Sequence, residues 1–390
     1  MRTRNYCMLL IFLFLMPGTL TAQKKKDEKK KDGYEFTDVV KLPVSTVKDQ
    51  QRTGTCWCFA TTSFIESELM RMGQPETDLS EMYFVKHAYL SKADLYLRYH
   101  GLANFGPGGQ AHDVMNVAKE HGFVPETVYP GKNYGSDIHN HGELSAVLRG
   151  FLDGLTGGRI RPLSPVWPEA FRKVVETYLG EEPSAFQVEG KTFTPKSYLK
   201  STGFDPDQYV EITSYTHHPF YEKINLEVPD NWSGDLYYNL PVEELMEVID
   251  HALMNGYTVA WDGDVSEQGM SHKNGVAILP EKEWDEMSDE EREKIFQTPS
   301  PEKEVTQEMR QETFNNFLTT DDHLMHIVGI SEDREGNRYY ITKNSWGTDS
   351  NEYGGFLRMS VPYVKMKTIA IMVHRDAIPE RIMKKLEAGE

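Results

Sequence analysis

The chain has 390 residues, a formal net charge of -18 and three cysteines. Its length is enough for two or three domains with a sizeable core, and its 39% hydrophobic and 26% charged residues are typical of a soluble globular protein. A strongly acidic surface repels phosphate backbones and anionic lipid headgroups, so we expect no nucleic acid partner.

Residues 1–22 have the pattern of a secretory signal peptide. Two arginines precede an apolar run from Met8 to Met16, and Pro17-Gly18 and a final Ala22 follow it. Nine apolar residues are too few to span a bilayer as a helix. We therefore expect an exported protein, periplasmic or secreted, without stable membrane insertion. Residues 23–33, rich in lysine, predict a charged flexible lead.

Only two cysteines, Cys56 and Cys58, follow the predicted signal peptide. Export permits disulfides, but residues at i and i+2 make a strained pair for a bridge. We expect no structural disulfide, so the core must stabilise the fold.

Hydrophobic periodicity predicts helices early in the chain and strands late in it. The first helix starts at Cys56 and stops at Gly73, and a second one is closed by Gly122. Further helices are expected at 168–180 and 241–256, with a capping box starting at Ser288 before a short helix. Strands are expected at 257–265, 323–333, 338–346 and 354–360. This order predicts an α+β protein with a cleft between two lobes.

Cys56 is the candidate nucleophile. A thiol at a helix start feels the positive end of the helix dipole, which lowers its pKa. A thiolate also needs a proton acceptor and a group that orients it, and His323 and Asn344 are the candidates. Gln50 and the backbone N–H of Cys56 would form an oxyanion hole for the attacked carbonyl.

These residues stand in motifs that resemble those of the papain-like cysteine peptidases. The pattern Q-x5-C-W is present at Gln50 and Cys56-Trp57, D-H-x5-G at Asp322-His323 and Gly329, and N-S-W-G at 344–347. The segment LSEMY at 79–83 and the pair Gly108-Gly109 occur in the same order. The resemblance implies a Cys56–His323–Asn344 triad, with Gln50 in the oxyanion hole and Gly108 and Gly109 binding the peptide substrate. It implies no cofactor and no metal.

Within that family the sequence is most similar to the bleomycin hydrolase, or aminopeptidase C, group. The similarity includes YLGEEPSAF, TPKSYL and YYNLPVEELMEVIDHAL in the middle of the chain and VHRDAIPERIMKKLEAGE at its end. It implies an aminopeptidase, and relatives form a homo-hexameric ring. In that group a C-terminal tail holds the substrate's amino group. The sequence stops at Glu390, short of such a tail, which keeps a papain-like endopeptidase with an open cleft as an alternative.

The resemblance also predicts the organisation of the chain. We expect a papain-like two-lobe fold, with a helical lobe, a β-barrel-like lobe and a helical insertion between them. The boundaries are 1–22 for the signal peptide, 23–33 for the lead, 34–130 for the helical lobe with the nucleophile, 131–240 for the insertion, 241–378 for the β-rich lobe with the histidine and asparagine, and 379–390 for a short C-terminal tail.

Two alternatives come from other classes. Cys56, Cys58, His323 and His326 have the right donor atoms for a tetrahedral zinc site. An extended strand would splay the two histidines apart, so this alternative is disfavoured and His326 is interpreted as structural, as is Cys58. An inactive peptide-binding protein is the other alternative, but all four catalytic positions are filled.

Overall fold

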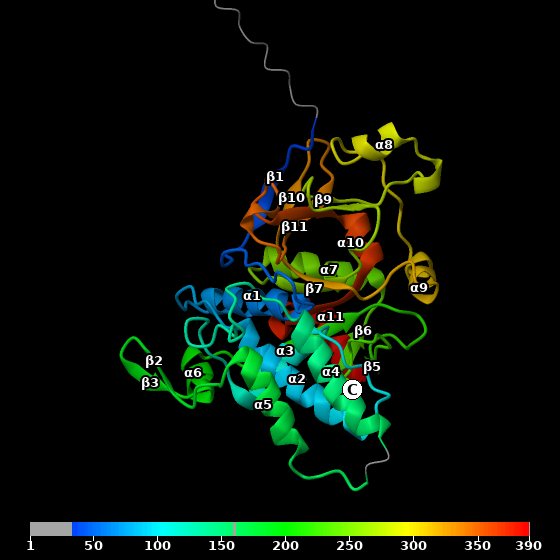
Figure 1. Ribbon diagram of the computed structural model, residues 1–390. Coiled ribbons are helices and arrows are strands. Elements are labelled where there is room, and N and C mark those ends of the chain that lie inside the picture. Colours follow the sequence, from blue (N-terminus) through cyan, green and yellow to red (C-terminus); the bar gives the residue numbers. More distant parts are fainter. Residues whose placement is uncertain (1–32, 159–160, 390) are drawn as a thin grey trace, which may run out of the picture. The chain divides into compact units, whose positions relative to one another are not determined.

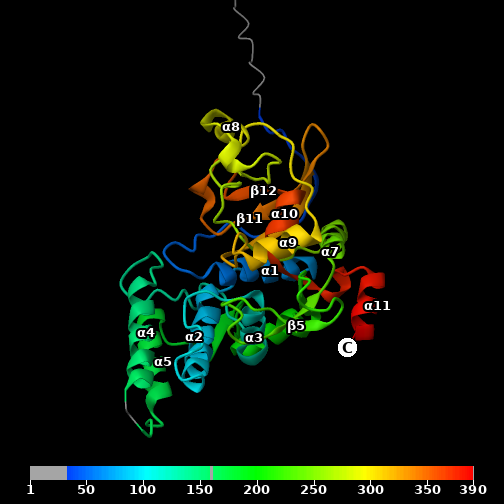
Figure 2. The same cartoon turned by 90° about the vertical axis from the view of Figure 1, so that its right-hand side faces the viewer.

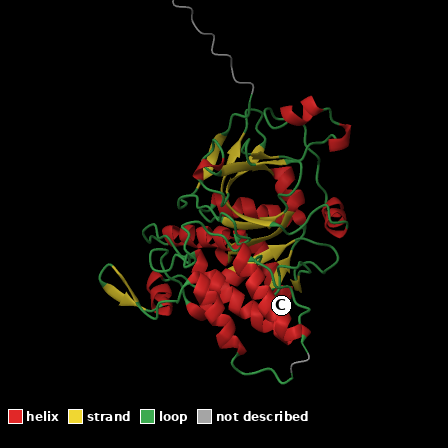
Figure 3. Cartoon of the chain, viewed as in Figure 1, coloured by secondary structure: helices red, strands yellow, loops and turns green. Residues whose placement is uncertain are grey.

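Helix α1 (Cys56–Arg71) lies between two other helices and the sheet in the computed structural model, which describes residues 33–158 and 161–389. Every side chain from Trp57 to Leu69 is buried, as expected for a helix surrounded by protein. α1 packs against β10 (His323–Glu332) and β7 (Val259–Gly263) on one side and against α2 (Glu81–Arg98) and α3 (Ala111–His121) on the other. The predicted first helix is confirmed, and Gly73, with φ of 84°, follows its end. Figure 3 shows a cluster of helices in the lower part of the view and most of the strands above it, with further helices around those strands.

The helical part contains α2 (Glu81–Arg98), α3 (Ala111–His121), α4 (Gly142–Gly157) and α5 (Trp167–Leu179). Ser80 caps α2 by accepting a hydrogen bond from the backbone N–H of Tyr83. α3 ends at Gly122, as predicted, because the glycine adopts φ of 84° there. Aromatic and aliphatic side chains of these helices form one core together with Leu324 of the sheet.

Eleven of the strands in the described residues form one mixed sheet. Its order is β5-β6-β4-β13-β7-β10-β11-β12-β9-β8, with β1 (Thr37–Lys41) paired to β10. The central strands β7 (Val259–Gly263), β10 (His323–Glu332), β11 (Arg338–Lys343) and β12 (Phe356–Ser360) confirm the four predicted strands, and β13 (Thr368–His374) was not predicted. Among the described residues the end strands β5 and β8 do not pair, so the expected barrel-like lobe is an open sheet rather than a closed barrel.

The middle of the chain is not purely helical, which differs from the expected helical insertion. After α4 and α5 come a hairpin, β2 (Phe186–Val188) and β3 (Lys191–Phe193), and α6 (Pro195–Thr202). Three strands then join the main sheet: β4 (Tyr209–Thr213), β5 (Lys223–Asn225) and β6 (Leu236–Asn239). β4 pairs with β13 because its sequence, YVEIT, is rich in residues that favour strands.

β10 presents opposite faces to two helices. Leu324 joins the core of the helical part, whereas Met325 and Ile327 pack with α7 (Val242–Met254) in a second core. This alternation follows from the two-residue period of a strand. α10 (Val361–Lys367) and α11 (Glu380–Gly389) complete the second core, and Figures 1 and 2 show α11 at the C-terminal end.

The remaining elements are short. They are β8 (Met270–Ser271), β9 (Val276–Ala277), α8 (Asp289–Lys294) and α9 (Gln307–Asn315). The predicted capping box is confirmed, with Ser288 and Glu291 exchanging hydrogen bonds. No helix among the described residues is long and apolar enough to cross a membrane. The predicted signal peptide and nearly all of the charged lead lie outside the described residues.

Candidate active site

Cys56 is the first residue of α1, and a close backbone approach places it there. A Cβ on Gly54 would lie 2.7 Å from Cγ of Pro107, so only glycine fits this turn without a shift. The indole N–H of Trp57 donates a hydrogen bond of 2.9 Å to the carbonyl of Pro107. These contacts join the start of α1 to the loop that carries Gly108 and Gly109.

His323 is the first residue of β10, and Asn344 follows β11, the neighbouring strand. Nε2 of His323 donates to Oδ1 of Asn344 over 2.8 Å, and both side chains are buried. The ring of Trp346 lies 5.2 Å from the imidazole, centre to centre, and packs against it. The bond to Asn344 occupies Nε2, which leaves Nδ1 of His323 as the nitrogen able to accept a proton.

The thiol of Cys56 is close to the same strand. The backbone of Leu324, the residue after His323, hydrogen-bonds to the thiol. Burial raises the pKa of Cys56 to about 12, the backbone bond to Leu324 opposes this rise, and the charges of Asp262 and Asp321 add to it. Burial also lowers the pKa of His323. The free enzyme therefore holds a neutral thiol and a neutral imidazole, whereas the helix dipole alone predicted a lowered thiol pKa.

Gln50 is held in place by hydrogen bonds to its own loop and to the segment that follows Asn344. Its Nε2 donates to the carbonyl of Thr53 over 2.8 Å, and its Oε1 accepts from the hydroxyl of Ser345 over 2.6 Å. Its backbone N–H bonds to the carbonyl of Ser345 at 2.8 Å. The first amide hydrogen is used by Thr53, and the second is the one available to an incoming carbonyl oxygen.

Gly108 and Gly109 approach neighbouring groups too closely for any side chain. A Cβ on Gly109 would lie 2.7 Å from a carboxylate oxygen of Asp113 and 3.0 Å from the Trp57 ring. A Cβ on Gly108 would collide with the carboxylate of Asp230. The segment therefore lies beside α1, and Asp230 covers Gly108.

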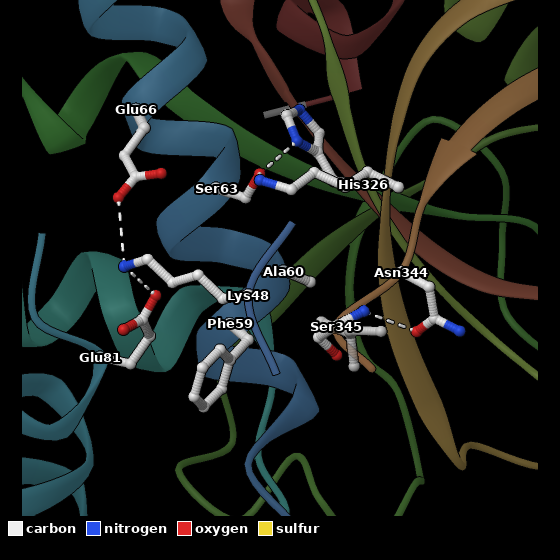
Figure 4. A pocket seen from close by; sticks show the side chains of 11 residues that line it. Lys48, Phe59, Ala60, Ser63, Glu66, Glu81, His326, Asn344 and Ser345 are labelled. Carbon is white, nitrogen blue, oxygen red and sulfur yellow. Dashed lines mark hydrogen bonds and ion pairs between the residues drawn. The ribbon is translucent and has the colours of Figure 1, made fainter. Parts of the chain in front are cut away.

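A buried polar network lies behind the site, around a cavity of about 10 Å³ (Figure 4). The hydroxyl of Ser63 bonds to Nδ1 of His326 at 2.9 Å and accepts from Lys343 at 2.8 Å. Lys48 lies between two buried carboxylates, 3.6 Å from Glu66 and 2.7 Å from Glu81. His326 faces α1 beneath the site, which agrees with its interpretation as structural.

The donor atoms of the zinc alternative do not converge. Sγ of Cys58 is fully buried and bonds to the carbonyl of Glu81 at 3.1 Å, and His326 bonds to Ser63. Within residues 33–158 and 161–389, the only group of three close metal-ligating side chains is His217, His218 and Glu227, which lies elsewhere. Cys58 and His326 therefore use their donor atoms in separate hydrogen bonds and do not point at a common metal position.

Sequence reasoning missed two features of the site. His272 accepts a hydrogen bond of 3.3 Å from Nδ2 of Asn344 and packs edge-on against Trp346. Nothing in its local sequence distinguishes it from any lone histidine. Asp262 is buried on β7 opposite Leu324. The signal for Asp262 was present, because a carboxylate inside an apolar strand is costly to bury.

The names of the homologues define the class to which this fold and its cysteine belong, that of the cysteine-type peptidases. Comparison with family models agrees. Residues 174–390 match the model of the Peptidase C1-like family, and residues 34–146 match the model of the papain family cysteine proteases. Because the first match covers more than half of the sequence, the chain belongs to the Peptidase C1-like family.

Individual relatives span most of the chain. Aminopeptidase G of Lactobacillus delbrueckii subsp. lactis is 25% identical, over 86% of this chain and 82% of its own length. Cysteine proteinase 1, mitochondrial, of Saccharomyces cerevisiae is 22% identical, over 93% of this chain and 81% of its own length. The crystal structure of PepW from Lactobacillus rhamnosis has the same fold, with a TM-score of 0.70, 18% identity and coverage of 90% of this chain and 85% of that one. The resemblance to the bleomycin hydrolase group is confirmed.

Proposed function

We propose that the protein is an aminopeptidase of the bleomycin hydrolase type, with Cys56 as nucleophile, His323 as acid and base, and Asn344 as the residue that orients His323. The observation that carries this proposal is the 2.8 Å bond between Nε2 of His323 and Asn344, because it leaves Nδ1 free to accept the thiol proton. The aminopeptidase names of the relatives G and W support the type of substrate.

In the proposed reaction, Sγ of Cys56 gives its proton to His323 and attacks the scissile carbonyl carbon. The resulting oxyanion accepts hydrogen bonds from the backbone N–H of Cys56 and from the free amide hydrogen of Gln50. His323 then protonates the departing amine as the C–N bond breaks, leaving a thioester on Cys56. A water molecule gives its proton to His323 and attacks the thioester, which releases the acid and restores the thiol.

The test compares Cys56→Ala with Cys58→Ala on a fluorogenic aminoacyl amide. Cys58 is buried against Glu81 and takes no part in the proposed reaction, so it controls for the loss of a thiol two residues away. We expect Cys56→Ala to abolish hydrolysis and Cys58→Ala to retain it. Hydrolysis by purified Cys56→Ala at the wild-type rate would overturn the proposal.

We also propose that residues 1–22 direct export of the protein, from their sequence pattern alone. The amino-terminal sequence of the secreted or periplasmic protein tests this, and a chain that keeps Met1 would contradict it. From the resemblance we further propose self-association into a homo-hexamer. Light scattering on the purified protein distinguishes six copies from one copy of the 44.8 kDa chain.

A further inference from the structure

Two aspartates that no other part of the proposed reaction uses lie next to the candidate nucleophile. Asp262 is directly opposite Leu324 in the pairing of β7 with β10, and Asp321 lies two residues before His323. The charges of both aspartates act on the thiol of Cys56. Asp262 belongs to the face of the sheet that packs against α1, and Asp321 lies in the segment that leads into β10.

Asp262 is buried beside the carboxyl of Asp321, which is its one hydrogen-bond partner. Its exposed fraction is 3%, and apart from the Asp321 carboxyl no described residue donates a hydrogen bond to its carboxylate oxygens. Burial, followed by the charge of Asp321, holds the pKa of Asp262 well above its usual range. A buried pair of carboxyls with so few donors is unfavourable, which indicates that a ligand supplies the missing donors.

Asp321 is half-buried and therefore reachable from outside. Nε2 of Gln110 donates to it over 2.8 Å, and burial, together with the charge of Asp230, raises its pKa to about 7. Oε1 of Gln110 is a further buried acceptor without a donor. No lysine or arginine among the described residues forms an ion pair with Asp262 or Asp321. The two carboxyls hydrogen-bond to each other, their raised pKa values favour a proton between them, and their other oxygen lone pairs are unused.

Asp230 covers Gly108 and so limits the space beside the site. The loop between β5 and β6 places its carboxylate over Gly108, where it accepts from Nδ2 of Asn104 at 2.9 Å. Trp232 anchors the loop by donating to Asp113 at 2.8 Å. A peptide backbone cannot continue across Gly108 while Asp230 lies there. The space for a bound peptide therefore ends at Asp230, and its carboxylate makes this end of the site acidic.

We propose that Asp262 and Asp321 bind the free α-ammonium group of the peptide's first residue and so restrict the enzyme to amino-terminal residues. An ammonium carries one positive charge and three N–H donors, which match the acidic carboxyl pair and its unused acceptors. An acetylated terminus has no charge and one N–H, so it leaves these buried acceptors unpaired. This inference rests on the proposed peptidase function and names the part of the site that selects its substrate.

The experiment uses the full-length protein and two fluorogenic aminoacyl amides that differ only in a free or an acetylated amine. We expect the wild type to prefer the free amine. We expect Asp321→Asn to lower the ratio of kcat/KM for free over acetylated substrate by about 10- to 100-fold, the effect of losing a charge-assisted hydrogen bond. Most of the change should be in KM. Asp285→Asn, an exposed aspartate remote from the site, is the matched control and should leave the ratio unchanged.

Asp262→Asn is the second variant and should lower the ratio in the same direction. Circular dichroism of both variants checks folding. A substitution at Asp321 disturbs the fold less than one at Asp262, because Asp321 is half-exposed and precedes the strand. A third substrate, acetylated and carrying arginine before the cleaved residue, separates the α-ammonium from a side-chain cation. Loss of activity on that substrate alone would mean that the pair binds an arginine, which overturns the inference.

The remaining outcomes separate the inference from the function on which it rests. Equal hydrolysis of the free and acetylated amides by the wild type overturns the inference and leaves a cysteine peptidase with an open cleft. An unchanged ratio in both aspartate variants also overturns it. Hydrolysis of neither amide by the wild type contradicts the proposed function itself.

Discussion

Asp262 lies directly opposite Leu324, the residue that follows His323 and whose backbone hydrogen-bonds to the thiol of Cys56. The pairing of β7 with β10 therefore brings a buried carboxyl to the candidate nucleophile. Selection of the substrate and ionisation of the thiol are coupled through this contact, because negative charge beside a thiol disfavours its thiolate.

The first prediction concerns the pH dependence of thiol alkylation. Because burial and the two aspartates raise the pKa of Cys56 to about 12, the thiolate fraction should rise tenfold per pH unit across neutral and mildly alkaline pH. We expect the rate of reaction with iodoacetamide, measured by mass spectrometry in a Cys58→Ala background, to increase continuously from pH 6 to pH 10. A plateau reached below pH 8 would show that the thiolate is already formed there.

Asp321→Asn should accelerate the same reaction. Removing a negative charge near the thiol lowers its pKa, so more thiolate is present at any fixed pH below that pKa. We expect faster alkylation at pH 8 in Asp321→Asn than in the parent protein, with Asp285→Asn unchanged. An equal or slower rate in Asp321→Asn would mean that its charge does not reach the sulfur.

Asn344→Ala should impair catalysis without unfolding the protein. The variant removes the only side-chain acceptor that Nε2 of His323 has among the described residues, and leaves that buried N–H unsatisfied. Such a loss costs about 1–3 kcal/mol, so we expect kcat/KM to fall by about 10- to 100-fold. Steady-state kinetics on the free-amine amide provide the measurement. Wild-type kinetics in this variant would exclude Asn344 from orienting the histidine.

His272→Phe should have a smaller effect in the same direction. The substitution keeps a ring against Trp346 but removes the acceptor for Nδ2 of Asn344. A neutral hydrogen bond is worth about 0.5–1.5 kcal/mol, which predicts a fall in kcat/KM of about 2- to 10-fold. The double variant with Asn344→Ala should be no worse than Asn344→Ala alone, because His272 acts through Asn344. Fully additive losses would contradict this.

Lys48→Met should destabilise the fold. Lys48 is the cation beside the buried carboxylates of Glu66 and Glu81, and burial already raises the pKa of Glu81 to about 7 although Lys48 opposes that rise. Removing one partner of a buried ion pair costs about 3–5 kcal/mol. Denaturant unfolding measures the change. The exposed Lys273→Met is the control, and a loss below 1 kcal/mol for Lys48→Met would show that water compensates the carboxylates.

The order and type of most elements could be predicted from local patterns in the sequence. The helix at Cys56, the helix that Gly122 closes and the strand that begins at His323 are all where periodicity and turn residues placed them. β4 to β6 were not predicted, because these strands are short and their pairing depends on β13, far along the chain. The openness of the sheet likewise depends on whether its end strands meet, which no local pattern encodes.

The sequence by itself determined which residues are candidates for chemistry. Cys56, His323 and Asn344 stand in motifs whose spacing is local, and the structure brings the last two into hydrogen-bond contact. Only the tertiary structure decided the charge state and the surroundings of the thiol. Burial of the thiol depends on the packing of α1 against the sheet. The acidic surroundings require Asp230, Asp262 and Asp321 to come close together from three separate segments. Long-range packing therefore sets the pKa values and the proposed substrate selection, which the motifs alone do not determine.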